Sequence, residues 1–313
     1  MAGIRNDVRS VARPSRPLFI VGQQRSGTSI LYRLVQEHPR FRPHHGLDLS
    51  ESHFLAVIAG DRDLTSSPSL RAFAALDDDG WRELERDLAC FERRRRVAVR
   101  APIGLLARDV RTWARLGCGG AARTYVAHAH RGRGAARFVE KTPNHLVWVR
   151  HLAAAFPDAK LLAITRHPVT AYASSLRRAR EDRSATWAAL PPRRFAERWR
   201  HETRLAMQAV GSGRVDMRLE RYEDLVRDPD AFQRRLFAWL DEQPLPDLPA
   251  PTDINEFAPA CEARQLYGEI TDLQRDWREH LSARDAADIE RMLAGPMAAL
   301  GYRPMADAAG QML

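Results

Sequence analysis

A loop bounded by two glycines, between an apolar strand and an apolar helix, is the strongest chemical signal in this chain. The apolar residues 18–21 predict a buried strand that ends at Gly22, and helical apolar spacing begins at Ile30. Backbone N–H groups of such a loop and the positive end of the following helix attract a phosphate-like anion. The sequence therefore predicts an anion-binding cradle formed by Gln24, Arg25, Ser26, Gly27, Thr28 and Ser29.

The cation of this loop is misplaced for a nucleotidase. Four residues separate Gly22 from Gly27, which is the spacing of ATP- and GTP-binding loops, but there a lysine follows the second glycine. Here Thr28 has that position, and the nearest cation is Arg25. No aspartate follows Ile164, where a nucleotidase often holds magnesium. These departures argue against a nucleotidase, and no metal is expected.

Lysine is scarce in this chain, so its positions are informative. Among 49 lysines and arginines, the lysines are Lys141 and Lys160. A lysine kept against such a bias is expected where a compact ammonium must approach a single oxygen, because the planar guanidinium of arginine does this poorly. We therefore expect Lys141 to take part in chemistry. The alternative interpretation is that both lysines survived by chance.

Three candidate ligand-binding positions each follow a predicted strand: Gly22, Lys141 and Arg166. Alternating strand and helix patterns predict a parallel sheet with helices on both faces. Ligands of such sheets bind at the carboxyl ends of the strands. The predicted fold class is therefore α/β, a single P-loop-like domain whose central parallel sheet is flanked by helices. The predicted strands are residues 18–21, 137–140, 160–165 and 215–220.

Helices are predicted from apolar spacing and from end signals. Several short helical patterns fall within residues 60–136, which we interpret as a helical insertion that shapes a substrate site. Residues 1–16 carry four arginines and no apolar signal core, so we expect a mobile basic tail before a domain of residues 17–313. The longer predicted helices are residues 144–156, 168–180, 195–210 and 232–240.

Composition limits the partners. The net charge of +9 favours anionic ligands, but no aromatic residues interleave the arginines at 93–96, so nucleic acid is not an expected partner. Three scattered cysteines argue against a disulfide framework. No run approaches the ~18 apolar residues of a membrane span, and a cytoplasmic setting is expected. No metal site is expected, because no standard ligand spacing connects His44, His45, Asp48 and His53.

Four blocks together resemble sulfotransferases that use 3′-phosphoadenosine 5′-phosphosulfate (PAPS). The first loop resembles their 5′-phosphosulfate-binding loop, with Arg25 where the family carries Lys or Arg. Residues 139–143 resemble a block of the heparan sulfate and related glycan sulfotransferases, in which the lysine is catalytic. Residues 166–174 resemble the block that binds the 3′-phosphate, and residues 219–225 resemble the segment whose tyrosine lies near the adenine.

This resemblance implies roles for individual residues. It makes Lys141 catalytic, assigns Arg166 and Ser174 to the 3′-phosphate, and places Tyr222 near the adenine. The loop residues 24–29 would hold the 5′-phosphosulfate. The transferred sulfuryl group carries less charge than a phosphoryl group, which agrees with the expectation that no metal is needed.

The general base is assigned from the same resemblance. The aryl and steroid sulfotransferases place a catalytic histidine two residues after the lysine, and here that position is Pro143. Residues 51–55 resemble a Glu-x-His-Phe-Phe stretch of the glycan sulfotransferases, whose glutamate is the base. Glu51 is therefore the first candidate base. His145, which is close to Lys141 in the sequence, is the second candidate.

The resemblance implies an O-sulfotransferase. Such an enzyme transfers the sulfuryl group of PAPS to a hydroxyl of a carbohydrate or small-molecule acceptor and leaves adenosine 3′,5′-bisphosphate. The acceptor is expected to be hydroxylated, and both sugar-like and anionic acceptors stay open. Two other functions also stay open: a kinase built on the same type of loop, and a nucleotide-binding module without turnover.

Overall fold

The computed structural model describes most of the chain. The predicted basic tail lies outside the described residues except for Arg16, and so do three of the polar residues considered above as metal ligands, His44, His45 and Asp48. The described residues are 16–41, 51–59, 78–98, 109–131, 136–183, 185–248, 270 and 276–305.

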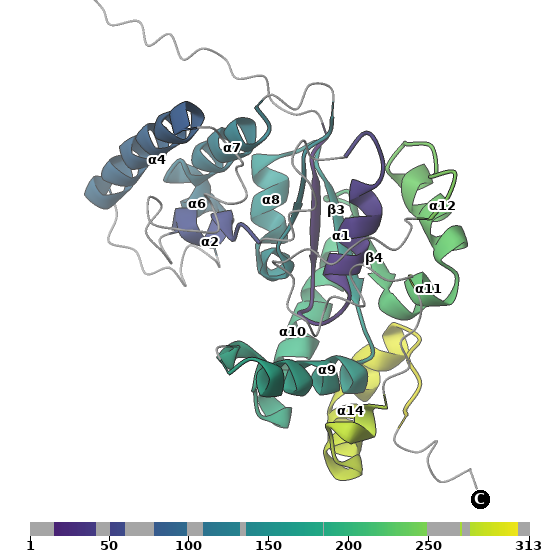
Figure 1. Cartoon of the computed structure of the whole chain (residues 1–313). Coiled ribbons are helices and arrows are strands. Elements are labelled where there is room, and N and C mark those ends of the chain that lie inside the picture. The colour runs from purple at the N-terminus through teal and green to yellow at the C-terminus, as the bar shows by residue number, and fades with distance from the viewer. Residues whose placement is uncertain are drawn as a thin grey trace, which may run out of the picture.

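The described strands form one parallel sheet in the order β2-β1-β3-β4, and Figure 1 shows helices around it. Each strand begins and ends within two residues of its predicted position, so the predicted α/β class with a central parallel sheet is confirmed. The first strand lies inside the sheet, between β2 and β3, and long crossover connections join these parallel strands. The strands are β1 (Leu18–Gly22), β2 (Val139–Lys141), β3 (Lys160–Thr165) and β4 (Met217–Arg221).

Helices cover both faces of the sheet, as the purely apolar sequence of β1 requires. Leu18 and Ile20 pack into one apolar cluster, and Phe19 and Val21 pack into another on the opposite face. The first cluster is completed by α1 (Thr28–Gln36), α11 (Tyr222–Arg227) and α12 (Pro229–Trp239). The second is completed in part by α8 (Val149–Ala155) and α10 (Pro192–Gly211).

Most of the described residues of the predicted insertion are helical. Its helices extend the layer of α8 away from the sheet, on the left of Figure 1. Trp81, Leu84 and Leu88 recur at helical spacing and are all buried in the same apolar cluster. The limits of the insertion, residues 60–136, stay a prediction. The described helices of this region are α4 (Asp78–Ala98), α6 (Val110–Arg115) and α7 (Cys118–Ala129), and α2 (Phe54–Ala59) lies just before it.

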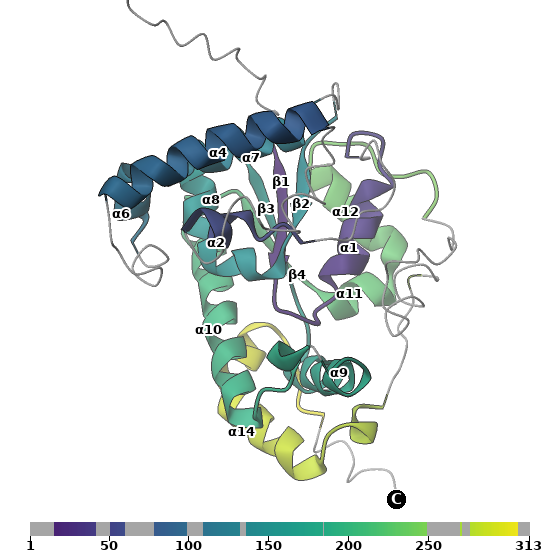
Figure 2. The same cartoon turned by 60° about the vertical axis from the view of Figure 1, so that its left-hand side comes forward.

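A third apolar cluster lies beyond the carboxyl ends of the strands. It joins α9 (Pro168–Glu181), the beginning of α10, η3 (Trp277–Glu279) and α14 (Ala283–Ala299), and Figure 2 shows α9 and α14 below the sheet. These elements therefore form a floor at the edge where ligands of parallel sheets bind. No helix in the described ranges is both long and apolar enough to cross a membrane.

Two details differ from the sequence predictions. The helix expected over residues 144–156 begins as a 3₁₀ helix, η1 (Pro143–Trp148), and becomes α-helical only in α8. Pro143 fixes the first turn and Thr142 before it is extended, as a residue preceding proline prefers to be. The patterns also missed α11 and α14. The six residues of α11 follow β4 directly, so they are too short to show a helical period.

Candidate active site

The loop between β1 and α1 is held in a shape that only glycine permits at two positions. Gly22 has a φ of 152°, and a Cβ there would lie 2.5 Å from the Ile164 carbonyl oxygen. Gly27 has a φ of 93°, and a Cβ there would lie 2.5 Å from a ring carbon of Tyr222. The two glycines therefore let the loop pass close to β3 and to α11. This close approach explains the glycine spacing that the sequence shows.

The same loop has the properties of an anion-binding cradle. Arg25 adopts a left-handed φ of 67°, rare for a residue other than glycine, and it precedes the left-handed Gly27 by two residues. The Ser26 side chain is fully buried, and its hydroxyl has no hydrogen-bond partner among the described residues. The N-terminal N–H groups of α1 lie at Thr28 and Ser29. These donors fit an anionic group such as a phosphosulfate.

Gln23 anchors the base of the loop. Its side-chain amide donates to the Trp199 carbonyl (3.0 Å) and to Thr203 Oγ1 (2.8 Å), and its carbonyl accepts from Thr165 Oγ1 (2.9 Å). The buried amide thereby ties β1 to β3 and to α10. Sequence analysis missed this residue. The signal was a polar side chain directly after a buried strand.

Residues predicted to bind the two ends of one nucleotide lie together. Arg25 Nε donates to Ser174 Oγ at 3.2 Å, which connects the loop to α9. The Arg166 guanidinium lies over the Tyr222 ring, 4.3 Å from its centroid. Because a Cβ on Gly27 would strike the same ring, Tyr222 lies against both the loop and Arg166. Blocks far apart in the sequence therefore form one surface at the carboxyl edge.

The two predicted catalytic groups contact each other. Lys141 Nζ donates to Glu51 Oε1 at 2.9 Å, and His53 Nε2 lies 3.3 Å from Glu51 Oε2. The lysine side chain is 2% exposed and the glutamate side chain 31%. Burial raises the pKa of Glu51, but attraction to Lys141 and the hydrogen bonds from Lys141 and His53 outweigh it and lower that pKa to about 2. The carboxylate is therefore ionised and partly open to solvent.

A buried carboxylate positions the segment that carries Glu51. Glu140, fully buried in β2, accepts hydrogen bonds from Ser52 Oγ (2.7 Å) and from Thr142 Oγ1. The His53 N–H donates to Thr142 Oγ1 at 3.3 Å, and His53 has a left-handed φ of 51°. These bonds attach residues 51–53 to the end of β2. Sequence analysis missed Glu140 in this role, although a charged residue within a buried strand was the available signal.

The second candidate base lies in the interior. His145 Nδ1 is 3.1 Å from Glu140 Oε2, and the ring packs edge-on against Phe54 with centroids 4.9 Å apart. The histidine is 1% exposed, and its Nε2 has no hydrogen-bond partner among the described residues. Burial raises the pKa of Glu140, but His145 and the two hydroxyls outweigh burial and lower it. The geometry joins His145 to the buried carboxylate rather than to the solvent-exposed face of the site.

The C-terminal part of the described chain packs beside Arg166. The His167 N–H, next to Arg166, donates to Glu223 Oε1 at 2.8 Å, and the Tyr302 hydroxyl donates to Glu223 Oε2 at 3.1 Å. His167 Nε2 lies 3.0 Å from the Arg303 carbonyl oxygen. Burial lowers the pKa of His167, so its neutral ring can donate to that carbonyl. The chain after α14 thus holds the strand end that carries Arg166.

Comparisons with known proteins agree with this architecture. The sequence profile described as "Sulfotransferase family" matches residues 17–247. No curated protein sequence matches the chain. Among solved structures, the sulfotransferase domain from the curacin biosynthetic pathway is similar with a TM-score of 0.55 and 16% identity, over 93% of this chain and 99% of that chain.

Two further solved structures are similar. One is the sulfotransferase domain of the Synechococcus PCC 7002 olefin synthase, with a TM-score of 0.49 and 20% identity over 90% of this chain and 95% of that chain. The other is sulfotransferase STF9 from Mycobacterium avium, with a TM-score of 0.49 and 18% identity over 95% of this chain and 80% of that chain. Because the family profile matches well over half of its length, this chain belongs to the sulfotransferase family, as its four sequence blocks predicted.

Proposed function

We propose that this protein is an O-sulfotransferase that transfers a sulfuryl group from PAPS to a hydroxyl of a carbohydrate or small-molecule acceptor. One observation carries the proposal. The ammonium of Lys141 and the carboxylate of Glu51, from positions 90 residues apart, meet at 2.9 Å beside the anion-binding loop. Sulfuryl transfer needs this combination, because charge on the transferred group must be stabilised while the acceptor hydroxyl loses its proton.

The donor-binding residues would be those that the resemblance implies. PAPS, when bound, supplies an activated sulfuryl group together with the phosphates by which it is recognised. The loop amides, the buried Ser26 hydroxyl and Arg25 would hold the 5′-phosphosulfate. Arg166 and Ser174 would hold the 3′-phosphate, and the Arg25 bond supports this, because Ser174 accepts it and keeps its own O–H to donate. Tyr222 would flank the adenine.

Glu51 is the proposed general base. It is ionised, partly exposed and held in place by Ser52 and His53 through the end of β2. A carboxylate with a pKa of about 2 is a weak base while Lys141 contacts it. Any anion that draws the Lys141 ammonium away raises the pKa of this carboxyl, because attraction to Lys141 is the largest effect that lowers it. Glu51 would therefore become a stronger base when the site is filled.

His145 fits a positioning role better than the role of base. Its contact with Glu140 and its packing against Phe54 support the segment that carries Glu51.

The cytoplasmic setting expected from the sequence also stays a prediction, because only the composition of the chain supports it.

Ligand-dependent stabilisation tests the proposal. A ligand that binds the folded state raises the melting temperature, and the stabilisation grows with the ratio of ligand concentration to its dissociation constant. We expect adenosine 3′,5′-bisphosphate to stabilise the protein in the absence of metal, and ATP with magnesium to have little effect. Stabilisation by ATP and magnesium alone would favour a kinase instead. Binding of the bisphosphate without formation of a sulfate ester from PAPS, followed by mass spectrometry, would favour a nucleotide-binding module without turnover.

A further inference from the structure

The helix that carries Ser174 begins at a histidine. His167 is the N-cap residue of α9, and its Nδ1 accepts a hydrogen bond from the Val169 N–H at 3.3 Å. Helix N-caps are usually serine, threonine, asparagine or aspartate, whose side-chain oxygens accept at any pH near neutrality. A histidine differs, because a proton on Nδ1 removes the acceptor. The N-terminus of α9 is therefore capped only while Nδ1 carries no proton.

The other ring nitrogen of His167 binds the C-terminal part of the described chain. Nε2 lies 3.0 Å from the Arg303 carbonyl oxygen, which can only accept, so Nε2 carries the ring proton. The ring also packs edge-on against Tyr302, with centroids 5.4 Å apart, and the residue is 5% exposed. One tautomer, neutral and protonated at Nε2, therefore satisfies both ring nitrogens and joins the start of α9 to the segment after α14.

The backbone at His167 is held on both sides. Its N–H donates to Glu223 Oε1 at 2.8 Å, and the carbonyl of the preceding Arg166 accepts from Trp199 Nε1 at 3.2 Å. The Arg166 guanidinium lies over the Tyr222 ring. The direction in which the Arg166 side chain leaves the end of β3 therefore depends on the contacts that hold His167.

Charged groups from three elements face the ring of His167. Glu290 of α14 lies 3.8 Å from Nε2, Glu223 of α11 binds the N–H of the same residue, and Arg221 ends β4. Burial lowers the pKa of His167 below its ordinary 6.5, the two carboxylates oppose this, and Arg221 adds to it. The ring is therefore mostly neutral at pH 6.5 and above, and it gains a proton only in more acidic solution.

We propose that His167, in its neutral form, positions the residues that bind the 3′-phosphate of the donor. This inference rests on the proposed function, which assigns Arg166 and Ser174 to that phosphate. The His167 ring caps the helix that carries Ser174, and its contact with the C-terminal segment holds the strand end that carries Arg166. Protonation of Nδ1 places a proton against the Val169 N–H and releases the cap. The 3′-phosphate end therefore loosens in acid, while the donor-binding loop keeps its anchor, because the Gln23 amide does not titrate.

The test replaces the histidine cap by one that does not titrate. His167→Asn keeps an oxygen that can cap α9, and His167→Ala removes the cap. His280→Asn is the control, because His280 Nδ1 lies 3.0 Å from the Arg180 guanidinium near the other end of α9. Calorimetric titration measures the affinities for adenosine 3′,5′-bisphosphate and for adenosine 5′-phosphosulfate, which lacks the 3′-phosphate. Phosphate groups themselves gain a proton near pH 6, so wild type and His167→Asn are compared at the same pH.

We expect the wild-type affinity for the bisphosphate, divided by that of His167→Asn, to fall about threefold to thirtyfold from pH 7.5 to 4.5, the fold-change that corresponds to a lost helix cap. The same ratio for adenosine 5′-phosphosulfate should stay constant. His167→Ala should already bind the bisphosphate more weakly at pH 7.5, and His280→Asn should follow the wild type. A constant ratio for the bisphosphate would overturn the inference, and so would an equal fall for both ligands, which would indicate a general loss of structure.

Two further results keep the inference separate from folding defects and from the proposed function. If neither His167 variant folds, assigned histidine-ring NMR spectra of the wild type decide: the neutral ring protonated at Nε2 is expected at pH 7.5, and a cationic ring or one protonated at Nδ1 would overturn the inference. Failure of the wild type to bind adenosine 3′,5′-bisphosphate at pH 7.5 would instead contradict the proposed function itself.

Discussion

The two edges of the sheet each carry one of the two lysines, and their surroundings differ. Lys160 begins β3 at the amino edge, and Lys141 ends β2 at the carboxyl edge. Lys160 Nζ contacts Asp216 at 2.8 Å and Asp241 at 3.5 Å, and it lies over the Trp239 ring, 4.7 Å from its centroid. Asp216 lies directly before β4, Trp239 ends α12, and Asp241 follows that helix. This lysine therefore ties chain segments together.

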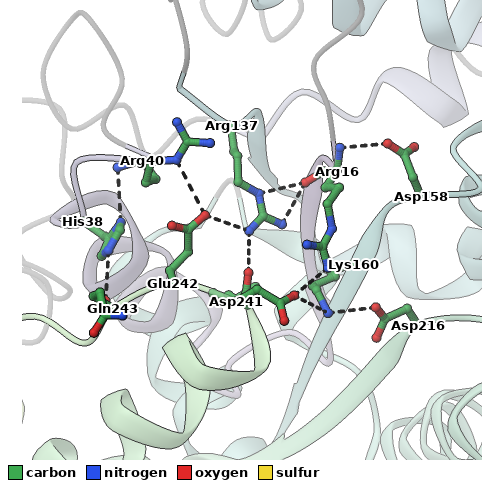
Figure 3. Close-up of polar contacts among 11 residues, drawn as sticks. Arg16, His38, Arg40, Arg137, Asp158, Lys160, Asp216, Asp241, Glu242 and Gln243 are labelled. Atoms are coloured by element: carbon green, nitrogen blue, oxygen red, sulfur yellow. Dashed lines mark hydrogen bonds and ion pairs between the residues drawn. The ribbon is translucent and has the colours of Figure 1, made fainter.

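The rest of the amino edge has the same character (Figure 3). Arg137 is 5% exposed, and its guanidinium donates to the Arg16 carbonyl (2.8 and 3.0 Å), to the Leu240 carbonyl (2.7 Å) and to Glu242 (3.2 Å). Arg16 in turn forms an ion pair with Asp241. The buried guanidinium of Arg137 is therefore bound by backbone and carboxylate oxygens of the protein. Such a network closes the amino edge of the sheet.

At the carboxyl edge, some polar groups stay exposed to solvent or lack a hydrogen-bond partner among the described residues. Glu51, the partner of Lys141, is partly exposed, and the nearby Ser26 hydroxyl is buried without a partner among the described residues. Both edges also contain left-handed residues other than glycine, Arg25 and His53 at one and Arg16 and Asp241 at the other. Strain and scarce lysines therefore do not by themselves identify a site. The carboxyl edge differs from the amino edge in its hydrogen-bonding groups that the rest of the protein does not satisfy.

The largest expected effect is that of Glu51→Gln. The substitution keeps the size of the side chain and removes the proton acceptor, so turnover should fall by roughly 10²–10⁴-fold, the usual contribution of a general base. The affinity for adenosine 3′,5′-bisphosphate should stay near that of the wild type. Steady-state kinetics and nucleotide titration measure the two quantities. If Glu51→Gln keeps its activity while His145→Ala or His53→Ala loses it, the base is an imidazole.

Exchanging each lysine for arginine tests the comparison most directly. Lys141→Arg should lower turnover by about 10²–10³-fold, the range seen when one charge-stabilising donor is lost, because a planar fork cannot replace a compact ammonium. Nucleotide binding should persist. Lys160→Arg should leave turnover unchanged, since arginine can still pair with Asp216 and Asp241. Equal turnover in the two variants would mean that Lys141, like Lys160, serves the fold.

Arg166→Ala should show which end of the nucleotide this residue holds. A hydrogen bond to a charged group contributes about 1.5–3 kcal/mol, so the affinity for adenosine 3′,5′-bisphosphate should fall about tenfold to a hundredfold. The affinity for adenosine 5′-phosphosulfate, which lacks the 3′-phosphate, should change much less. Calorimetric titration of both ligands provides the measurement. Equal losses for the two ligands would contradict the assignment to the 3′-phosphate.

The smallest expected effect is a pH dependence of stability from the Glu51–Lys141 pair. The folded-state pKa of Glu51 is lowered from 4.5 to about 2, so the pair stabilises the fold above pH 4.5 and loses this contribution as the pH falls toward 2. The stability of wild-type protein relative to Lys141→Met should therefore decline over that interval. Urea unfolding at a series of pH values tests this. A difference that is constant from pH 6 to 2 would mean that Lys141 does not set this pKa.

Much of the site was predictable because its parts are local. The strand, loop and helix around Gly22 and Gly27, and the strand end before Arg166, are each encoded within about ten residues by apolar runs and special residue types. Contacts between those parts were not predictable from pattern. The role of Gln23 depends on Trp199 and Thr203, 176 and 180 residues away.

The sequence by itself determined the α/β class, the glycine-bounded loop and the family, because hydrophobic period and motif spacing are properties of short segments. Only the tertiary structure decided which polar groups meet. Ser52 and Glu51 reach Glu140 and Lys141 across 88 and 90 residues, and no local pattern encodes that approach. It also decided that Lys160 is structural while Lys141 stays beside open polar groups. The physical reason is that burial and hydrogen-bond satisfaction depend on every segment that packs around a residue.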